Sequence, residues 1–233
     1  MASRAATRVT TSYAAVRDRV AAACRRAGRA ADTVRLVAVS KGMTAKALRA
    51  AANEGARDFG ENYVQEWQAK RDAIADVAAV SWHFIGRIQR NKAAAIAEFG
   101  LVHSVADVRA ARVLDVAAER RGAPLCVLLQ VNLAAESTKG GVAAADLPSL
   151  LDSARRLSWV RVLGLMTIPP PFAPEAVRPL FAALRTLRDR QEEPQGLPEL
   201  SMGMSADFEV AIEEGATLVR VGTAIFGPRK EVT

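Results

Sequence analysis

One lysine stands where its amine could react with a ligand. Lys41 directly follows Val34–Ser40, a nearly continuous apolar run that is typical of a strand buried in a parallel sheet. Partial desolvation at such a place favours the neutral amine, which attacks an aldehyde to form a Schiff base. The alternative is a lysine that caps the strand and pairs with a nearby carboxylate, and position alone favours that salt bridge.

Two later segments carry residues suited to a phosphate group. Ser205 and Gly222–Thr223 each follow a strand-like run, and glycine lets a ligand approach the backbone closely. In α/β barrels, the loops after the last two strands commonly bind phosphate through backbone N–H groups. Ordinary turn chemistry explains the same residues equally well. A ligand that used both places would carry an aldehyde and a phosphate, as pyridoxal phosphate and some sugar phosphates do.

The elements that must position these residues alternate between short apolar strands and amphipathic helices. Helical spacing extends from the N-terminus to Gly28, and further helices are predicted at 44–54, 108–121 and 147–157. Eight strands are predicted at Val34–Ser40, Arg57–Glu61, Ser81–Gly86, Leu101–Val105, Leu125–Asn132, Val160–Ile168, Glu199–Ser205 and Thr217–Gly222.

Eight alternating units in 233 residues predict a single (β/α)8 barrel of the TIM type, with an extra N-terminal helix. We expect residues 1–233 to form one domain. An open doubly wound sheet is the alternative, but the first predicted strand is not followed by the glycine-rich GxGxxG loop common in that fold.

Composition argues against several other functions. The net charge of +7 raises the question of a nucleic-acid partner, but the arginines are scattered and aromatic residues make up only 5%. Two cysteines and two histidines show no metal-binding spacing, so we expect no metal. No apolar run reaches the roughly 18 residues that a membrane span needs, and the N-terminus lacks the apolar stretch of a signal peptide. We therefore expect a cytoplasmic protein.

Eight ordered motifs between residues 34 and 227 resemble the pyridoxal phosphate homeostasis protein family. The resemblance implies a fold like the barrel domain of alanine racemase. The motifs are VAVSK (37–41), FGENYVQE (59–66), WHFIG-x-x-Q-x-NK (82–92), HSV (103–105), QVN-x-x-x-E-x-x-KGG (130–141), GLM-x-IPP (164–170), LSMGMS-x-D (200–207) and VR-x-GTAIFG (219–227).

The resemblance also implies roles for single residues. Lys41 matches the lysine that holds pyridoxal 5′-phosphate (PLP) as a Schiff base. The phosphate-binding positions of the family are matched by Ser205, Gly222 and Thr223. Arg220 matches the arginine that faces the pyridine nitrogen of the cofactor ring. Asn62 and Met166 match residues that line the cofactor. Lys139 matches a rim lysine that could receive the cofactor. The sequence departs from the family pattern at Gly42-Met43-Thr44 and at Arg87-Ile88, which leaves the shape of those loops open.

The implied function is PLP homeostasis, as a carrier or reservoir with indirect effects on amino-acid and keto-acid balance. A charged Arg220 beside the pyridine nitrogen would disfavour its protonation and weaken carbanion chemistry. The chain ends at Thr233, so we expect no second domain that could supply a catalytic base. We therefore expect no catalytic residue, and a PLP-dependent amino-acid racemase is the alternative. The implied partners are PLP and PLP-dependent apo-enzymes, with no membrane or nucleic acid, and we expect a monomer.

Overall fold

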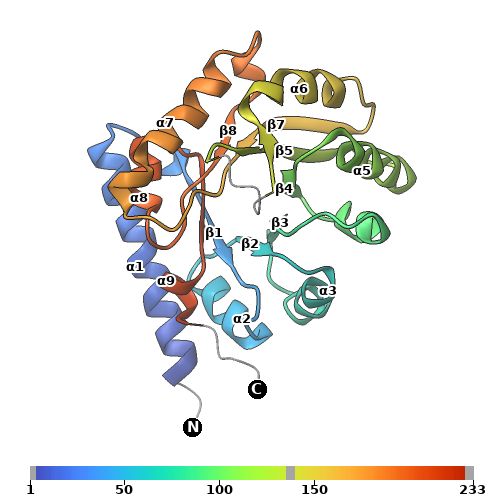
Figure 1. The fold of residues 1–233 in the computed structure, drawn as a ribbon. Coiled ribbons are helices and arrows are strands. Elements are labelled where there is room, and N and C mark those ends of the chain that lie inside the picture. Colours follow the sequence, from blue (N-terminus) through green and yellow to red (C-terminus); the bar gives the residue numbers. More distant parts are fainter. Residues whose placement is uncertain (1–3, 135–139, 229–233) are drawn as a thin grey trace.

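A computed structural model describes residues 4–134 and 140–228 of the chain as a ring of parallel strands surrounded by helices (Figure 1). The strands of the ring are β1 (Arg35–Val39), β2 (Asp58–Glu61), β3 (Ser81–Phe84), β4 (Leu101–Val105), β5 (Leu125–Asn132), β7 (Val160–Met166), β8 (Glu199–Ser201) and β9 (Leu218–Val221). A two-residue strand that the sequence did not predict, β6 (Val142–Ala143), pairs with β5.

The order of the strands closes the sheet into a barrel. Neighbours run β4-β3-β2-β1-β9-β8-β7-β5, and an additional pairing of β4 with β5 joins the two ends. All of these pairs are parallel, which requires a crossover after each strand. The predicted (β/α)8 barrel with an N-terminal helix is confirmed, and the open sheet is wrong.

The helices cover the outside of the barrel. They are α1 (Arg4–Arg26), α2 (Ala45–Asn53), α3 (Val64–Ala73), α4 (Ala93–Ile96), α5 (Val108–Arg121), α6 (Leu147–Arg155), α7 (Pro174–Asp189), α8 (Phe208–Glu213) and α9 (Thr223–Phe226). The extra helix α1 packs against α2, α8 and α9 (Figure 1). Among the described residues, no helix combines the length and the apolar character needed to cross a bilayer.

The apolar core has two parts because strand side chains alternate between the faces of the sheet. The larger part lies between the strands and the helices and includes Phe59, Phe84 and Phe181. A smaller cluster fills the inside of the barrel, and its buried members are Val37, Leu101, Leu128, Met166 and Leu218. Partly buried apolar residues pack against this cluster, and the interior also holds buried polar side chains such as His83 and His103.

Gly164 marks the closest approach of two strands and gives a stability prediction. A Cβ added there would overlap the backbone carbonyl of Glu199 on the paired strand. Because backbone cannot move aside cheaply, we expect Gly164→Ala to lower the free energy of unfolding by about 1–3 kcal/mol. Urea denaturation measures this change. Gly196→Ala is the control, because its nearest contact would be an ordinary 3.6 Å from Arg155 Nη2. Equal stability of the two variants would contradict the prediction.

Candidate functional site

The carboxyl ends of all the barrel strands meet at one rim, where the predicted site residues lie. Lys41 follows β1, and Gly222 follows β9, which pairs with β1. Lys41, Gly222 and Thr223 line one small pocket of about 50 Å³. Lys41 and the loop at Gly222 are therefore brought together, although about 180 residues separate them along the chain.

The backbone on both sides of Lys41 is held from below by α3. Lys70 Nζ donates to the carbonyl of Ser40 at 2.7 Å, and also to Glu61 Oε1 and Glu66 Oε2 at 2.7 and 2.8 Å. Gly42 N donates to the same Glu66 oxygen at 2.7 Å, and Gly42 has a φ of 72°, which glycine adopts without strain. These bonds fix the turn that presents the lysine.

Lys70, Glu61 and Glu66 form a hydrogen-bonded clamp under Lys41, and the pKa values of its two carboxylates shift in opposite directions. Glu61 is fully buried, and desolvation raises its pKa against the opposing hydrogen bonds from Lys70 and Ser40. Its Oε2 has no hydrogen-bond partner among the described residues. Glu66 is less buried. Its desolvation is outweighed by the bonds from Lys70 and the Gly42 backbone and by the charges of Lys70 and Lys41, so its pKa is lowered.

The loop after β8 meets the start of α9 through a serine hydroxyl. Ser205 Oγ accepts from Gly222 N at 3.3 Å and from Ala224 N at 3.2 Å. The strand ends at Ser201, earlier than predicted, because Gly203 adopts a φ of +91° and turns the chain. A Cβ on Gly203 would lie 2.6 Å from Ala211 Cβ. Backbone N–H groups and the Ser205 hydroxyl thus converge at one place on the rim.

Arg220 lies inside the barrel beneath this loop. Its side chain is almost completely buried, and its two terminal nitrogens donate to Ser201 Oγ at 2.6 Å and to the Thr167 carbonyl at 2.9 Å. Burial lowers its pKa to about 10, with Asp207 opposing the shift, so the guanidinium stays charged at neutral pH. Each terminal nitrogen carries a second N–H, which these two bonds leave for a ligand.

The remaining predicted residues lie at or just below the rim. Asn62 follows β2 and lines a hollow of about 620 Å³, together with Gly86, Gln130 and Ile168. Its Oδ1 is buried without a hydrogen-bond partner among the described residues. Met166 is fully buried in the inner apolar cluster, where β7 ends. Lys139 lies outside the residues that the structure describes.

Sequence reasoning missed the residues that support the site from within. Lys70 and Glu66 are spaced i, i+4 on a helix, a spacing that could have indicated their ion pair. His83 and His103 lie inside the barrel, and the alternation of their strands could have placed them there. Nothing in the sequence indicated that they bond to each other.

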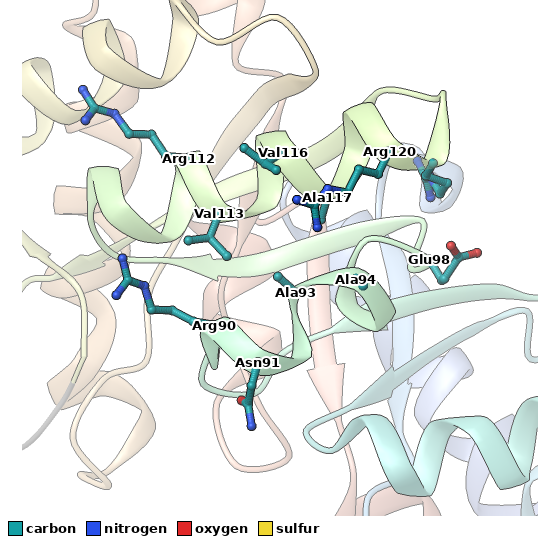
Figure 2. Close-up of a pocket in the computed structure, with 11 residues that line it drawn as sticks. Arg90, Asn91, Ala93, Ala94, Glu98, Arg112, Val113, Val116, Ala117 and Arg120 are labelled. Carbon is teal, nitrogen blue, oxygen red and sulfur yellow. The ribbon is translucent and has the colours of Figure 1, made fainter.

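A second hollow of about 650 Å³ lies on the outer surface beside α4 and α5. The residues that line it include Arg90, Arg112 and Arg120, together with Val113 and Val116 of α5 (Figure 2). None of the described residues that line it is a lysine, so it offers no amine to an aldehyde. The chemistry of an aldehyde ligand therefore favours the rim.

Comparison with known proteins places this chain among relatives of similar length. The family model described as alanine racemase, N-terminal domain, matches residues 12–230. Proteins named pyridoxal phosphate homeostasis protein are 45% identical in Aquifex aeolicus, over 92% of this chain and 96% of that protein, and 48% identical in Pseudomonas aeruginosa, over 94% of both. The solved structure of PipY from Synechococcus elongatus with PLP bound is 40% identical, covers 84% of this chain and 93% of that one, and superposes with a TM-score of 0.77.

Proposed function

This chain belongs to the pyridoxal phosphate homeostasis protein family, and we propose that it binds PLP at the barrel rim and acts as a carrier or reservoir of the cofactor. The observation that carries the proposal is the shared pocket of Lys41, Gly222 and Thr223, above the buried charge of Arg220. In this proposal the chain keeps PLP available to apo-enzymes, and so affects amino-acid and keto-acid balance indirectly.

The groups at the rim fit the parts of this cofactor. Lys41 supplies the amine that bonds the aldehyde carbon, with loss of one water. Ser205, Gly222 and Thr223 supply a hydroxyl, a close backbone approach and a further hydroxyl for the phosphate. Asn62 Oδ1, which has no hydrogen-bond partner in the part of the chain that the structure describes, supplies a polar contact at the rim, and Met166 an apolar surface below it.

Arg220 favours holding the cofactor over using it. Bound PLP supplies an electron-withdrawing ring whose strength depends on a protonated pyridine nitrogen. A guanidinium that is charged at neutral pH and can only donate hydrogen bonds disfavours a proton on the nitrogen it faces. We therefore propose a non-catalytic protein with no catalytic residue and no metal.

Transfer of the cofactor to an acceptor tests the proposal. The loaded chain is mixed with the apo form of a PLP-dependent aminotransferase, with a phosphatase present to destroy free PLP. With phosphatase present, we expect aminotransferase activity to return only if the chain passes PLP directly to the apo-enzyme. Without phosphatase, we expect activity to return whether the transfer is direct or passes through free PLP. Failure to take up PLP, or to release it in both assays, would overturn the carrier function.

Thr223 gives a graded prediction for the phosphate loop. Its side chain is exposed, so Thr223→Val removes a hydroxyl with little effect on the fold. A hydrogen bond to a charged group contributes about 1.5–3 kcal/mol, so we expect the Kd for PLP to rise about tenfold or more. Equilibrium dialysis measures the Kd. The matched control is Thr186→Val, an exposed threonine on outer helix α7, and an equal effect of both substitutions would rule out the assigned role.

A racemase is the second candidate, because the matching family model is that of the alanine racemase barrel. Racemisation needs an acid or base on each face of the cofactor. We expect no solvent deuterium to enter at Cα when the loaded chain is incubated with amino acids. Exchange of that position for any amino acid would instead establish catalysis.

We propose a cytoplasmic, single-domain monomer that binds neither nucleic acid nor membrane. Scattered arginines and few aromatic residues support the absence of nucleic-acid binding. Light scattering tests the monomer, and a DNA-binding titration at low salt tests the absence of nucleic-acid binding.

A further inference from the structure

A line of hydrogen-bonded polar side chains crosses the inside of the barrel. Arg220 Nη1 and Ser201 Oγ are 2.6 Å apart, and Ser201 Oγ lies 2.8 Å from His103 Nδ1. His103 Nε2 lies 2.9 Å from His83 Nδ1, and His83 Nε2 lies 2.8 Å from Asp58 Oδ1. The line therefore connects the residue beneath the rim with the start of β2, at the opposite end of the barrel.

These side chains replace apolar packing that a barrel interior usually has. Both histidines are fully buried, and so is Ser201. A buried polar group needs a partner, and here every ring nitrogen has one. The five residues come from β2, β3, β4, β8 and β9, so a packing role for any single one does not explain their alignment.

Only one direction of donation satisfies all of these contacts with neutral rings. The Asp58 carboxylate can only accept, so a neutral His83 donates to it from Nε2 and accepts at Nδ1. A neutral His103 then donates to His83 from Nε2 and accepts at Nδ1. Ser201 Oγ therefore turns its proton towards His103 Nδ1 and accepts from Arg220, which can only donate. Desolvation, and then the charges of His83, Arg220 and Arg35, hold the pKa of His103 well below its usual range, which agrees with a neutral ring.

We infer that Ser201, His103, His83 and Asp58 form a relay of positioning residues that orients Arg220 towards the cofactor ring and couples that ring to the far end of the barrel. This inference rests on the proposed function, because it assigns Arg220 to the ring of PLP. Hydrogen bonds in series polarise one another in a medium of low dielectric constant, so a change at the ring nitrogen is felt at His83.

One added proton would reverse the relay. If His83 Nδ1 took up a proton, His83 would donate at both nitrogens, and His103 would have to carry its proton on Nδ1. Ser201 would then accept from both His103 and Arg220. Other charged groups at this end of the barrel include Arg57, which precedes Asp58 in the chain, and the pair of Arg35 Nη2 and Glu199 Oε1 at 2.6 Å.

Nitrogen-15 NMR of the histidine side chains tests the relay in the wild-type chain. The sequence has only two histidines, so both rings can be followed without ambiguity. We expect both rings to carry the proton on Nε2, and both to shift when PLP is added to the cofactor-free chain. Rings protonated on Nδ1, or a His83 signal unchanged by saturating PLP, would overturn the relay.

Variants of His103 test positioning separately from folding. We expect His103→Leu to raise the Kd for PLP about tenfold and to change the pH profile of the visible absorbance of the bound cofactor. His103→Gln keeps one donor and one acceptor and should recover part of both properties. Leu101→Val alters packing on the same strand without removing a hydrogen bond, and should change neither.

The outcomes separate this inference from the proposed function. Normal PLP binding by the wild type with equal behaviour of His103→Leu and Leu101→Val would overturn the relay alone. Failure of the wild type to bind PLP would overturn the proposed function and the relay with it. If His103→Leu does not fold, the wild-type NMR result decides.

Discussion

Replacing Lys41 with alanine is expected to abolish covalent attachment of PLP. The substitution removes the amine that bonds the aldehyde, and alanine offers no other nucleophile. The visible absorbance of the lysine-linked cofactor should disappear, because it requires the C=N bond. Borohydride reduction followed by mass spectrometry should find the cofactor on an intact wild-type chain and none at this position in the variant.

The effect should be confined to this lysine. Lys46, on α2, is exposed and provides a matched control, because Lys46→Ala removes the same charge close by in the sequence. Some PLP should still bind Lys41→Ala without a covalent bond, because Arg220 and the phosphate loop remain. Full retention of the reduced adduct in Lys41→Ala would place the linkage on another lysine.

Replacing Lys70 with methionine is expected to cause the largest loss of stability, about 3–5 kcal/mol near neutral pH. Breaking a buried ion pair leaves an uncompensated buried charge, and here Glu61 is fully buried while Lys70 is 7% exposed at its side chain. The same substitution frees the turn around Lys41, because Lys70 donates to the Ser40 carbonyl. PLP binding should therefore weaken together with stability.

The loss should depend on pH in a defined direction. Desolvation raises the pKa of Glu61 in the folded chain, and the bond from Lys70 opposes that rise. Without Lys70 the folded pKa rises further above the unfolded value. A group of this kind contributes most to stability below its unfolded pKa, and that contribution is lost as the pH rises through the folded pKa. The variant should therefore be closer to the wild type at about pH 5 than at about pH 7.5.

Urea unfolding at both pH values measures this effect. Lys46→Met serves as the exposed control and should change stability little. Adding Glu61→Gln to Lys70→Met should recover part of the loss, because it removes the buried charge. A loss that is the same at both pH values would contradict the assigned role of Glu61.

Much of the fold could be predicted from local patterns. The alternation of apolar strands and helices indicated eight units, and α5 has the predicted bounds, from Val108 to Arg121. The helix after β1 begins at Ala45, with Thr44 as its N-cap, because the threonine hydroxyl accepts from Ala47 N. Five of the eight predicted strands were too long at their carboxyl ends, since the chain turns onto the rim there, as at Gly203, and the other three end at the predicted residue.

The candidate site divides in the same way. Local patterns in the sequence are enough to predict which residues stand at strand ends, and a parallel barrel gathers all such ends at one rim. Lys41 and Gly222 were predicted on that basis, and the structure places them in one pocket. Their roles towards PLP stay predictions.

The side chains that support these residues from below are brought there by contacts between distant parts of the chain. His103 bonds Ser201 across 98 positions of sequence, and Lys70 reaches Ser40 across 30. Local periodicity shows which face of a strand a side chain occupies, but not which side chain lies opposite. That pairing depends on how the strands are staggered when β4 joins β5 and the barrel closes. The clamp under Lys41 and the polar line to Arg220 therefore exist only in the closed barrel.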